Sequence, residues 1–172
     1  MKMIFQTERL LIRELITPDK YLFFEMMSNP NVMNPIPVKV MTQSESDLKF
    51  KELIERENPR LRNIWALTKK GNNGFIGLCG LLKNNEHDDE IAYRLMEKHW
   101  GKGYGTEIAK GLIGFGFDEL CSYKMTADVN IANLKSIKIL EKFLTPVKEF
   151  YNEKDKCFDR RYAVSKRDYV RN

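Results

Sequence analysis

The sequence predicts a single α/β domain that spans residues 1–172. The chain is long enough to bury one sizeable core. Apolar residues alternate along several short segments, as in half-buried strands, and recur with helical spacing along others. Read in order, these segments give the succession β-α-α-β-β-β-α-β-α-β-β. Glycine- and asparagine-rich turns separate them, with no internal repeat and no linker.

The composition is that of a soluble globular protein, with 42% apolar and 31% charged residues. No apolar run approaches the ~18 residues of a membrane span. Residues 1–13 contain Glu8, Arg9 and Arg13 and no small-residue cleavage site, so we expect no signal peptide. Three scattered cysteines predict a reducing, cytoplasmic setting without a disulfide framework.

The N-terminal quarter predicts a strand followed by a helix. Residues 8–16 form the expected strand, with Leu10, Ile12 and Glu14 on one face. The segment Thr17-Pro18-Asp19 predicts a helix start, with Thr17 as the cap and proline in the first turn. Asn29-Pro30 is expected to end this helix.

Residues 30–42 are proline-rich yet apolar, which is unusual for a loop. Two interpretations stay open: a flap that lines an acceptor pocket, or a loop packed flat on the core. A second helix follows, capped by Thr42 or Ser44. Its expected buried residues are Leu48, Phe50, Leu53 and Ile54.

Three strands are predicted in the middle of the chain. Residues 64–68 and 75–82 are expected to pair through a hairpin turn at 71–74. A polar turn at 84–89 leads into an alternating strand at 91–96.

A glycine-rich loop at 99–107 follows that strand. Gly101, Gly103 and Gly105 alternate, and helical spacing begins at Ile108 and continues to Leu120. Glycine permits positive φ and close approach of backbone to a ligand. Free N–H groups at a helix start, aided by the helix dipole, can hold a phosphate. The arrangement therefore predicts a phosphate-binding loop, although an ordinary tight turn would have the same glycines.

Two better-known phosphate fingerprints do not match this loop. A P-loop requires Ser or Thr after Gly-Lys, but Gly103 follows Lys102. A dinucleotide fingerprint requires glycine at the position of Thr106.

The C-terminal third predicts a strand at 123–129, a helix at 133–143 stopped by Pro146, and two strands near 147–151 and 158–165. The helix at 108–120 is expected to bury core residues that include Leu120. Its three interior glycines indicate close packing onto the sheet.

The segment Trp100-Gly-Lys-Gly-Tyr-Gly-Thr-Glu107 resembles the acyl-CoA pyrophosphate loop of the GNAT acetyltransferase superfamily. It is most similar to the branch of ribosomal-protein N-terminal acetyltransferases. A second segment, Asn133-Leu-Lys-Ser136 followed by Glu141-Lys142, resembles the downstream family motif. The resemblance extends over nearly the whole chain.

This resemblance implies the GNAT fold: a mixed, mostly antiparallel sheet of six to seven strands flanked by about four helices. The sheet splays between the strand ending near Met96 and the strand at 123–129. It also implies direct transfer of an acetyl group from acetyl-CoA to a primary amine, with pantetheine in the splay. The implied cofactor-binding residues are Tyr93, Arg94, Leu95, Met96, Gly101, Lys102, Gly103, Tyr104, Gly105, Thr106 and Asn133.

The resemblance leaves the catalytic groups less determined. The superfamily often has a tyrosine where this chain has Leu140, so Ser136 is the implied hydrogen-bond donor to the leaving thiolate. Glu90 and Asp128 compete as the base that removes the amine proton. Each of them could instead be a solvated acid. The family's helix-ending glycine is missing before Pro146, which puts the last two strands in doubt.

The partner is expected to be an amine, either a small molecule or a protein N-terminus. No membrane partner and no metal site are expected, and a homodimer is left open. The alternatives are a non-catalytic acyl-CoA-binding module and a nucleic-acid binder. The net charge of +5 suits any anion, but acids interrupt the basic segment at 154–171, which favours a solvated hairpin face.

Overall fold

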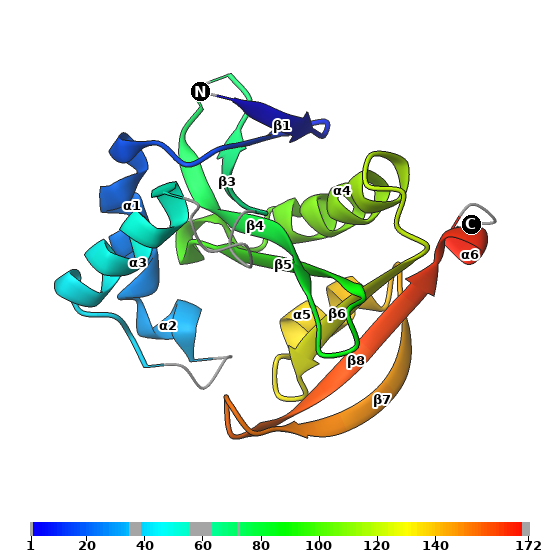
Figure 1. Cartoon of the computed structure of the whole chain (residues 1–172). Coiled ribbons are helices and arrows are strands. Elements are labelled where there is room, and N and C mark those ends of the chain that lie inside the picture. Colours follow the sequence, from blue (N-terminus) through cyan, green and yellow to red (C-terminus); the bar gives the residue numbers. More distant parts are fainter. Residues whose placement is uncertain (1, 35–38, 56–62, 72, 170–172) are drawn as a thin grey trace.

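The computed structural model describes residues 2–34, 39–55, 63–71 and 73–169. Within them, eight strands form one sheet in the order β1-β2-β3-β4-β5-β6-β8-β7 (Figure 1). The strands are β1 (Met3–Gln6), β2 (Leu10–Arg13), β3 (Ile64–Lys69), β4 (Phe75–Lys83), β5 (Asp89–Leu95), β6 (Lys124–Asn130), β7 (Thr145–Asn152) and β8 (Cys157–Ser165). The helices are α1 (Lys20–Met27), α2 (Pro30–Met33), α3 (Gln43–Glu55), α4 (Tyr104–Asp118), α5 (Leu134–Leu140) and α6 (Lys166–Tyr169).

The sheet opens between β5 and β6. All other neighbouring strands pair antiparallel, whereas β5 and β6 are parallel and pair only at Asp89↔Met125 and Glu90↔Thr126. Beyond Glu90 the two strands separate. The mixed, splayed sheet is therefore confirmed. The described residues form one strand more than the upper number expected, and six helices instead of about four.

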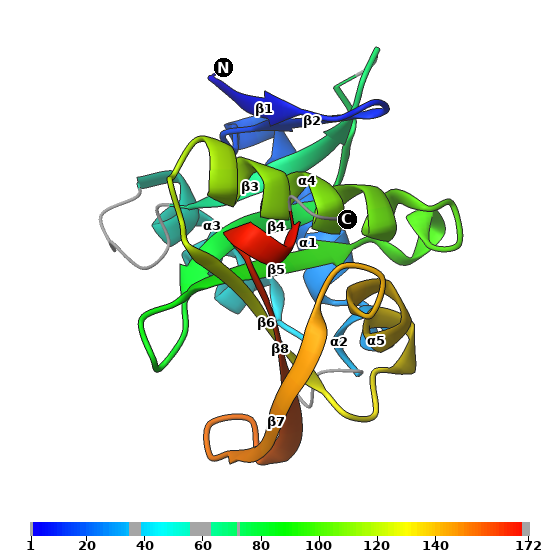
Figure 2. The ribbon, with the colours of Figure 1, turned by 90° about the vertical axis from the view of Figure 1, so that its right-hand side faces the viewer.

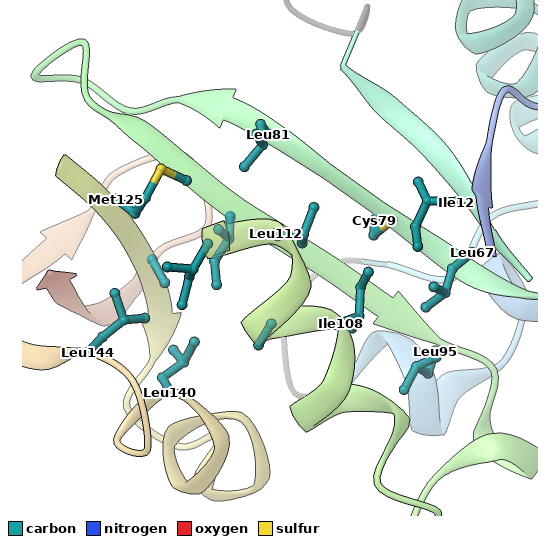
Figure 3. Close-up of a cluster of buried hydrophobic side chains, with 14 of the residues drawn as sticks. Ile12, Leu67, Cys79, Leu81, Leu95, Ile108, Leu112, Met125, Leu140 and Leu144 are labelled. Atoms are coloured by element: carbon teal, nitrogen blue, oxygen red, sulfur yellow. The ribbon is translucent and has the colours of Figure 1, made fainter. Parts of the chain in front are cut away.

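Helix α4 covers one face of the sheet (Figure 2). Its Ile108 and Leu112 are fully buried against strand residues such as Leu67, Cys79 and Leu95, and Figure 3 shows these side chains directed toward one another. Burying this apolar surface is the main driving force for assembling the layer.

Helices α1 and α3 cover the other face with a second core. Phe23 of α1 and Phe50 of α3 pack with ring centroids 5.3 Å apart. Val32 and Met33 of α2 join this core and are buried. For these residues, the interpretation of 30–42 as a segment packed on the core holds, whereas residues 35–38 lie outside the described part.

The N-terminus differs from the prediction. Strand β1 was not expected, and the strand predicted at 8–16 is shortened to β2, so Glu14 lies beyond it. Thr17 is not the helix cap: a short 3-10 turn at Thr17–Asp19 begins after Ile16. No side-chain hydrogen bond caps this turn, and the Asp19 carboxylate accepts the Ile16 N–H at 3.0 Å.

Helix α3, the second helix predicted, is capped by Thr42, one of the two caps expected for it. The Thr42 hydroxyl accepts the Glu45 N–H at 3.3 Å, and the Glu45 carboxylate accepts the Thr42 N–H at 2.7 Å. Leu48 was predicted to be buried but is 66% exposed, and Leu120 is 45% exposed. Leu48 lies on the solvent-exposed side of α3, and Leu120 lies past the end of α4, so neither reaches the core.

Helix α4 begins at Tyr104, four residues earlier than predicted, so its first turn is part of the glycine loop. A Cβ at Gly116 would lie 2.5 Å from Met125 Sδ, and one at Gly111 would lie 2.8 Å from Thr7 Cγ2. Close packing onto the sheet therefore explains these two glycines. At Gly114 the nearest atom is the Tyr169 hydroxyl at 3.8 Å, so close packing explains nothing there.

The role predicted for Pro146 is wrong. Helix α5 ends at Leu140, and Pro146 lies inside β7. Strand β7 is at the edge of the sheet, where a missing N–H is tolerated, and the pairing shifts register between Pro146 and Lys148. In the described part of the chain, no helix has the length and apolar character needed to cross a membrane.

Candidate active site

A cavity of about 340 Å³ occupies the opening between β5 and β6. Its walls come from both sides of the sheet: Phe23 and Leu53 from the α1/α3 side, and Ser136 and Leu140 from α5. The cavity thus joins the two faces of the sheet where the strands separate. Among the predicted site residues, it is lined by Glu90, Tyr93, Arg94, Asp128, Asn133 and Ser136.

The glycine loop presents free N–H groups at the start of α4. Gly103 is the N-cap in the left-handed region (φ +81°), and Gly101 also has a positive φ of +71°. The first helical hydrogen bond is donated by Glu107 to Gly103. No side chain caps the helix. The N–H groups of Tyr104, Gly105 and Thr106 are therefore available to an anion.

Arg9, which the sequence reasoning missed, braces this loop. It forms an ion pair with Glu107 at 2.7 Å and donates to the Lys102 carbonyl at 3.0 Å. Its guanidinium carbon lies 4.9 Å from the centre of the Tyr104 ring. A Cβ at Gly103 would lie 3.2 Å from an Arg9 nitrogen. The cation thus lies beside the free N–H groups, which suits a phosphate.

Lys102 and Trp100 complete the shape of the loop. The Lys102 ammonium donates to the Lys98 carbonyl at 2.8 Å. The Trp100 indole N–H donates to the Leu95 carbonyl at 2.9 Å, and Lys135 of α5 lies 4.7 Å from the ring centre. Trp100 therefore ties the loop to the end of β5 and to α5.

The backbone of β5 supplies donors at the opening. The Met96 N–H donates to the Ile76 carbonyl of β4 and is not free. Because N–H directions alternate along an antiparallel strand, those of Tyr93 and Leu95 point away from β4. Of the four residues predicted there, these two have N–H groups on the strand edge that β6 leaves unpaired.

The Tyr93 hydroxyl lies beside Ser136. Burial raises the pKa of Tyr93 to about 12, and the nearby Ser136 hydroxyl opposes this shift. Within the described residues, the buried Tyr93 hydroxyl has no partner with good hydrogen-bond geometry. Asn133 caps α5 by accepting the Ser136 N–H at 3.2 Å. Both hydroxyls are thus hydrogen-bond donors at the α5 side of the cavity.

Glu90 is a half-buried carboxyl at the point where β5 and β6 part. Burial raises the pKa of Glu90 to about 7, with a further contribution from the negative charge of Asp128. At neutral pH, Glu90 is therefore divided between its acid and base forms, which suits proton transfer.

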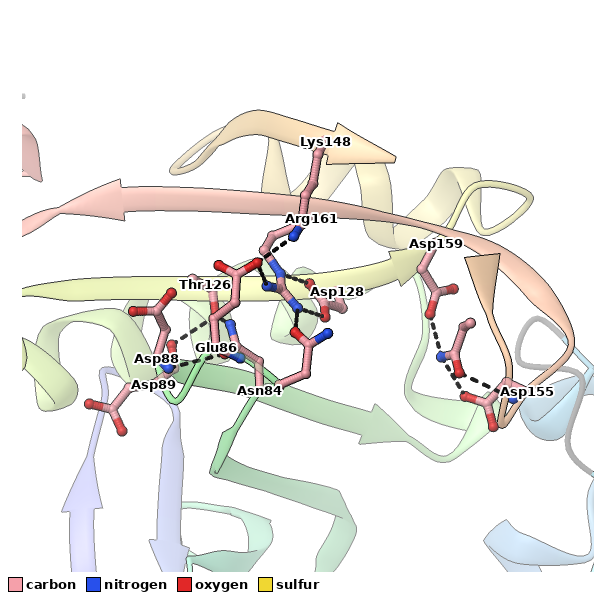
Figure 4. Close-up of polar contacts among 12 residues, drawn as sticks. Asn84, Glu86, Asp88, Asp89, Thr126, Asp128, Lys148, Asp155, Asp159 and Arg161 are labelled. Carbon is pink, nitrogen blue, oxygen red and sulfur yellow. Dashed lines mark hydrogen bonds and ion pairs between the residues drawn. The ribbon is translucent and has the colours of Figure 1, made fainter. Parts of the chain in front are cut away.

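Asp128 is held in an ion pair. Both of its oxygens accept from Arg161 of β8, each at 2.7 Å, and Arg161 also forms an ion pair with Glu86 at 2.9 Å (Figure 4). Arg161 donates to Asn85 at 2.8 Å as well. Arg161 is 2% exposed, which corrects the interpretation of the whole 154–171 segment as a solvated face. No sequence motif marks Arg161 as a site residue, because its partners Asp128, Glu86 and Asn85 lie far from it along the chain.

Comparisons with known proteins agree with this geometry. The family model described as an acetyltransferase (GNAT) domain matches residues 9–143. An uncharacterized N-acetyltransferase, p20, from Bacillus licheniformis is 30% identical over 139 residues, which cover 78% of this chain and 77% of p20.

Solved structures share the fold. A GNAT-family acetyltransferase from Bacillus anthracis gives a TM-score of 0.80 at 24% identity, covering 95% of this chain and 98% of that one. Spermidine N-acetyltransferase from Vibrio cholerae, solved with CoA and spermine, gives 0.75 at 17% identity, covering 94% and 98%. These likenesses do not single out the ribosomal-protein branch. On the match to residues 9–143, the chain belongs to the GNAT family of acetyltransferases.

Proposed function

We propose that this protein transfers the acetyl group of acetyl-CoA directly to a primary amine. The observation that carries the proposal is the cavity that crosses the sheet between β5 and β6. It has the free N–H groups of α4 near one side and the half-buried Glu90 in its wall. The spermidine and aminoglycoside acetyltransferases that share the fold were both solved with CoA, which supports the same cosubstrate here.

The residues of the loop fit the phosphates of CoA. The N–H groups of Tyr104, Gly105 and Thr106 would bind the pyrophosphate, with Arg9 adding a positive charge. The Tyr93 and Leu95 N–H groups would hold the pantetheine arm and the thioester oxygen, on which negative charge develops.

When bound, acetyl-CoA supplies a thioester: its carbonyl carbon gains the bond to nitrogen and loses the bond to sulfur. Glu90 accepts the proton that the amine must lose, since only the lone pair attacks. Asp128 keeps both oxygens on Arg161 and acts on Glu90 only through its charge. The geometry thus favours Glu90 of the two predicted bases.

Ser136 and Tyr93 stabilise the departing sulfur. A free thiol titrates near pH ~8.5, well below the pKa of Tyr93 of about 12. Tyr93 therefore donates a hydrogen bond and keeps its proton, and Ser136 does the same. The nitrogen loses its second proton to solvent after attack, the thiolate takes a proton from solvent, and Glu90 returns its proton to solvent. The reaction therefore releases CoA thiol, an amide and one proton.

Two measurements test this function. Acetyl-CoA should raise Tm, and Gly103→Glu should abolish the rise because a carboxylate would occupy the phosphate position. Gly71→Glu is the matched control: Gly71 also has a positive φ, +93°, but no atom within 4 Å of its Cβ position. The control should keep the acetyl-CoA response despite similar backbone strain.

Turnover is tested with a panel of amines and peptides by detecting free thiol. Ser136→Ala should slow turnover and leave acetyl-CoA binding nearly intact. An acetyl-CoA-dependent Tm rise without turnover of any amine would instead indicate a non-catalytic acyl-CoA-binding module. No Tm rise at all would contradict both functions.

A further inference from the structure

We infer that Arg94 recognises a negatively charged group on the acceptor, so that the preferred acceptor is a small amine that also carries a carboxylate or phosphate. This inference rests on the proposed function and narrows its substrate class. It starts from the position of one side chain on β5.

Arg94 lies on the acceptor side of the sheet. Side chains alternate between the faces of a strand, so Glu90 and Arg94 share one face while Tyr93 and Leu95 share the other. Arg94 is paired in register with Leu78, which packs on the α1/α3 core. The phosphate-binding N-terminus belongs to α4, on the opposite face. Arg94, which the resemblance implied to bind the cofactor, is therefore on the wrong side of the sheet to bind the CoA phosphates.

The guanidinium has no carboxylate partner within the described residues. Its Nη1 contacts the sulfur of Met27 at 3.3 Å and that of Met33 at 3.4 Å. Thioether sulfur is a weak acceptor that cannot balance a full positive charge. Burial lowers the pKa of Arg94, but an arginine remains charged at any physiological pH.

The other arginines in the protein interior show what is missing at Arg94. Arg13 donates to both oxygens of Asp19 at 2.6 and 2.7 Å, and Arg161 does the same to Asp128. Both are 2% exposed. A desolvated guanidinium is stable beside a bidentate oxyanion and unfavourable without one. Among the described residues, the fold thus supplies an anion to these two arginines and none to Arg94, which lines the cavity.

The cavity contains both groups that such an acceptor needs. Glu90 and Arg94 line the same cavity and are four residues apart, about 13 Å along an extended strand. Phe23 and Leu53 form an apolar wall beside them. An amine directed at Glu90 could thus place an oxyanion on Arg94, whereas a second ammonium at that position would meet a like charge.

The test compares acceptors that differ only in the acid, with thiol release as the readout. The pairs are 4-aminobutyrate with butylamine and phosphoethanolamine with ethanolamine, and spermidine is the polycation. The wild type should favour the acidic member of at least one pair by roughly 10- to 100-fold in kcat/KM, as expected for hydrogen bonds to a charged group. The two pairs distinguish a carboxylate from a phosphate.

Arg94→Met should abolish this preference, mainly by raising KM for the acidic acceptor. Methionine suits the site because the arginine already lies against two thioethers. Arg94→Lys, which keeps the charge without the bidentate geometry, should restore part of the preference. Lys51→Met removes an exposed positive charge from α3 and should leave the preference unchanged.

The inference is overturned if the wild type turns over neutral or polycationic amines as well as acidic ones, or if Arg94→Met keeps the preference. Turnover in those cases would leave the acetyltransferase function standing. If no amine is turned over, the function itself fails, and binding then decides the inference. 4-Acetamidobutyrate, the product of the carboxylate arm, should raise Tm of the wild type more than that of Arg94→Met; equal shifts would overturn it.

Discussion

Replacing Glu90 by glutamine should stabilise the protein above neutral pH and at the same time impair catalysis. The folded protein raises the pKa of Glu90 from 4.5 to about 7, first through burial and then through the charge of Asp128. Each pKa unit corresponds to about 1.4 kcal/mol, so ionised Glu90 destabilises the fold by about 3 kcal/mol. Partial solvent exposure of the side chain reduces this figure toward about 2 kcal/mol.

The sign follows from proton binding. Between pH 4.5 and about 7 the folded state holds the Glu90 proton more tightly than the unfolded state does. Stability therefore falls as pH rises through this window and stays low above it. Glutamine has no charge to desolvate, so the variant loses this dependence.

Urea denaturation of both proteins across pH measures the effect. The gain from Glu90→Gln should be close to zero near pH ~4 and should reach about 2–3 kcal/mol near pH ~8. In the same variant, kcat/KM should fall by about 10²- to 10⁴-fold. Its pH profile should also lose the acid limb, which is the decrease in kcat/KM as pH falls through the pKa of Glu90. A stability difference that does not change with pH would refute the reasoning about burial. An unchanged pH profile of kcat/KM would refute the role as base.

Three further predictions concern charge pairs and helix packing. Asp128→Asn should destabilise the fold by about 3 kcal/mol in urea denaturation, because Arg161 loses its bidentate partner. It should also move the acid limb of kcat/KM to lower pH, and a limb that stays in place would contradict coupling to Glu90. Asp19→Asn, which leaves the buried Arg13 without its anion, should cost about 3–5 kcal/mol; a loss under about 1 kcal/mol would show that the pair is dispensable. In α4, Gly114→Ala should raise stability by about 0.5–1 kcal/mol, whereas Gly116→Ala should lower it by about 1–3 kcal/mol because its Cβ would meet the Met125 sulfur; effects of the same sign would contradict the packing argument.

Local signals were enough to predict most of the fold. Alternating apolar residues and turn sequences identified the strands from 64 to 96, because both patterns depend on neighbouring residues. The glycine loop was found in the same way, since positive φ at Gly101 and Gly103 is a local requirement. The opening beside Glu90 followed only from the family resemblance.

What sequence reasoning missed depends on contacts across the chain. Arg9 contacts Glu107 from 98 residues away, and Arg161 contacts Asp128 from 33 residues away. No local pattern marks either pair. Pro146 was misread because a proline after a helix suggests a stop, and only the sheet order shows that β7 is an edge strand that tolerates proline.

The structure suggests why one strand can serve two substrates. A β-strand offers three directions: its two faces and its hydrogen-bonding edge. In β5 the face with Tyr93 turns toward α4 and α5, the face with Glu90 and Arg94 turns toward α1 and α3, and the unpaired edge opens into the cavity. The edge lies between the faces, so a thioester held there would be within reach of a group on either. Donor and acceptor would then depend on different side chains of the same strand. A substitution at Arg94 should therefore change the choice of amine without altering the affinity for acetyl-CoA.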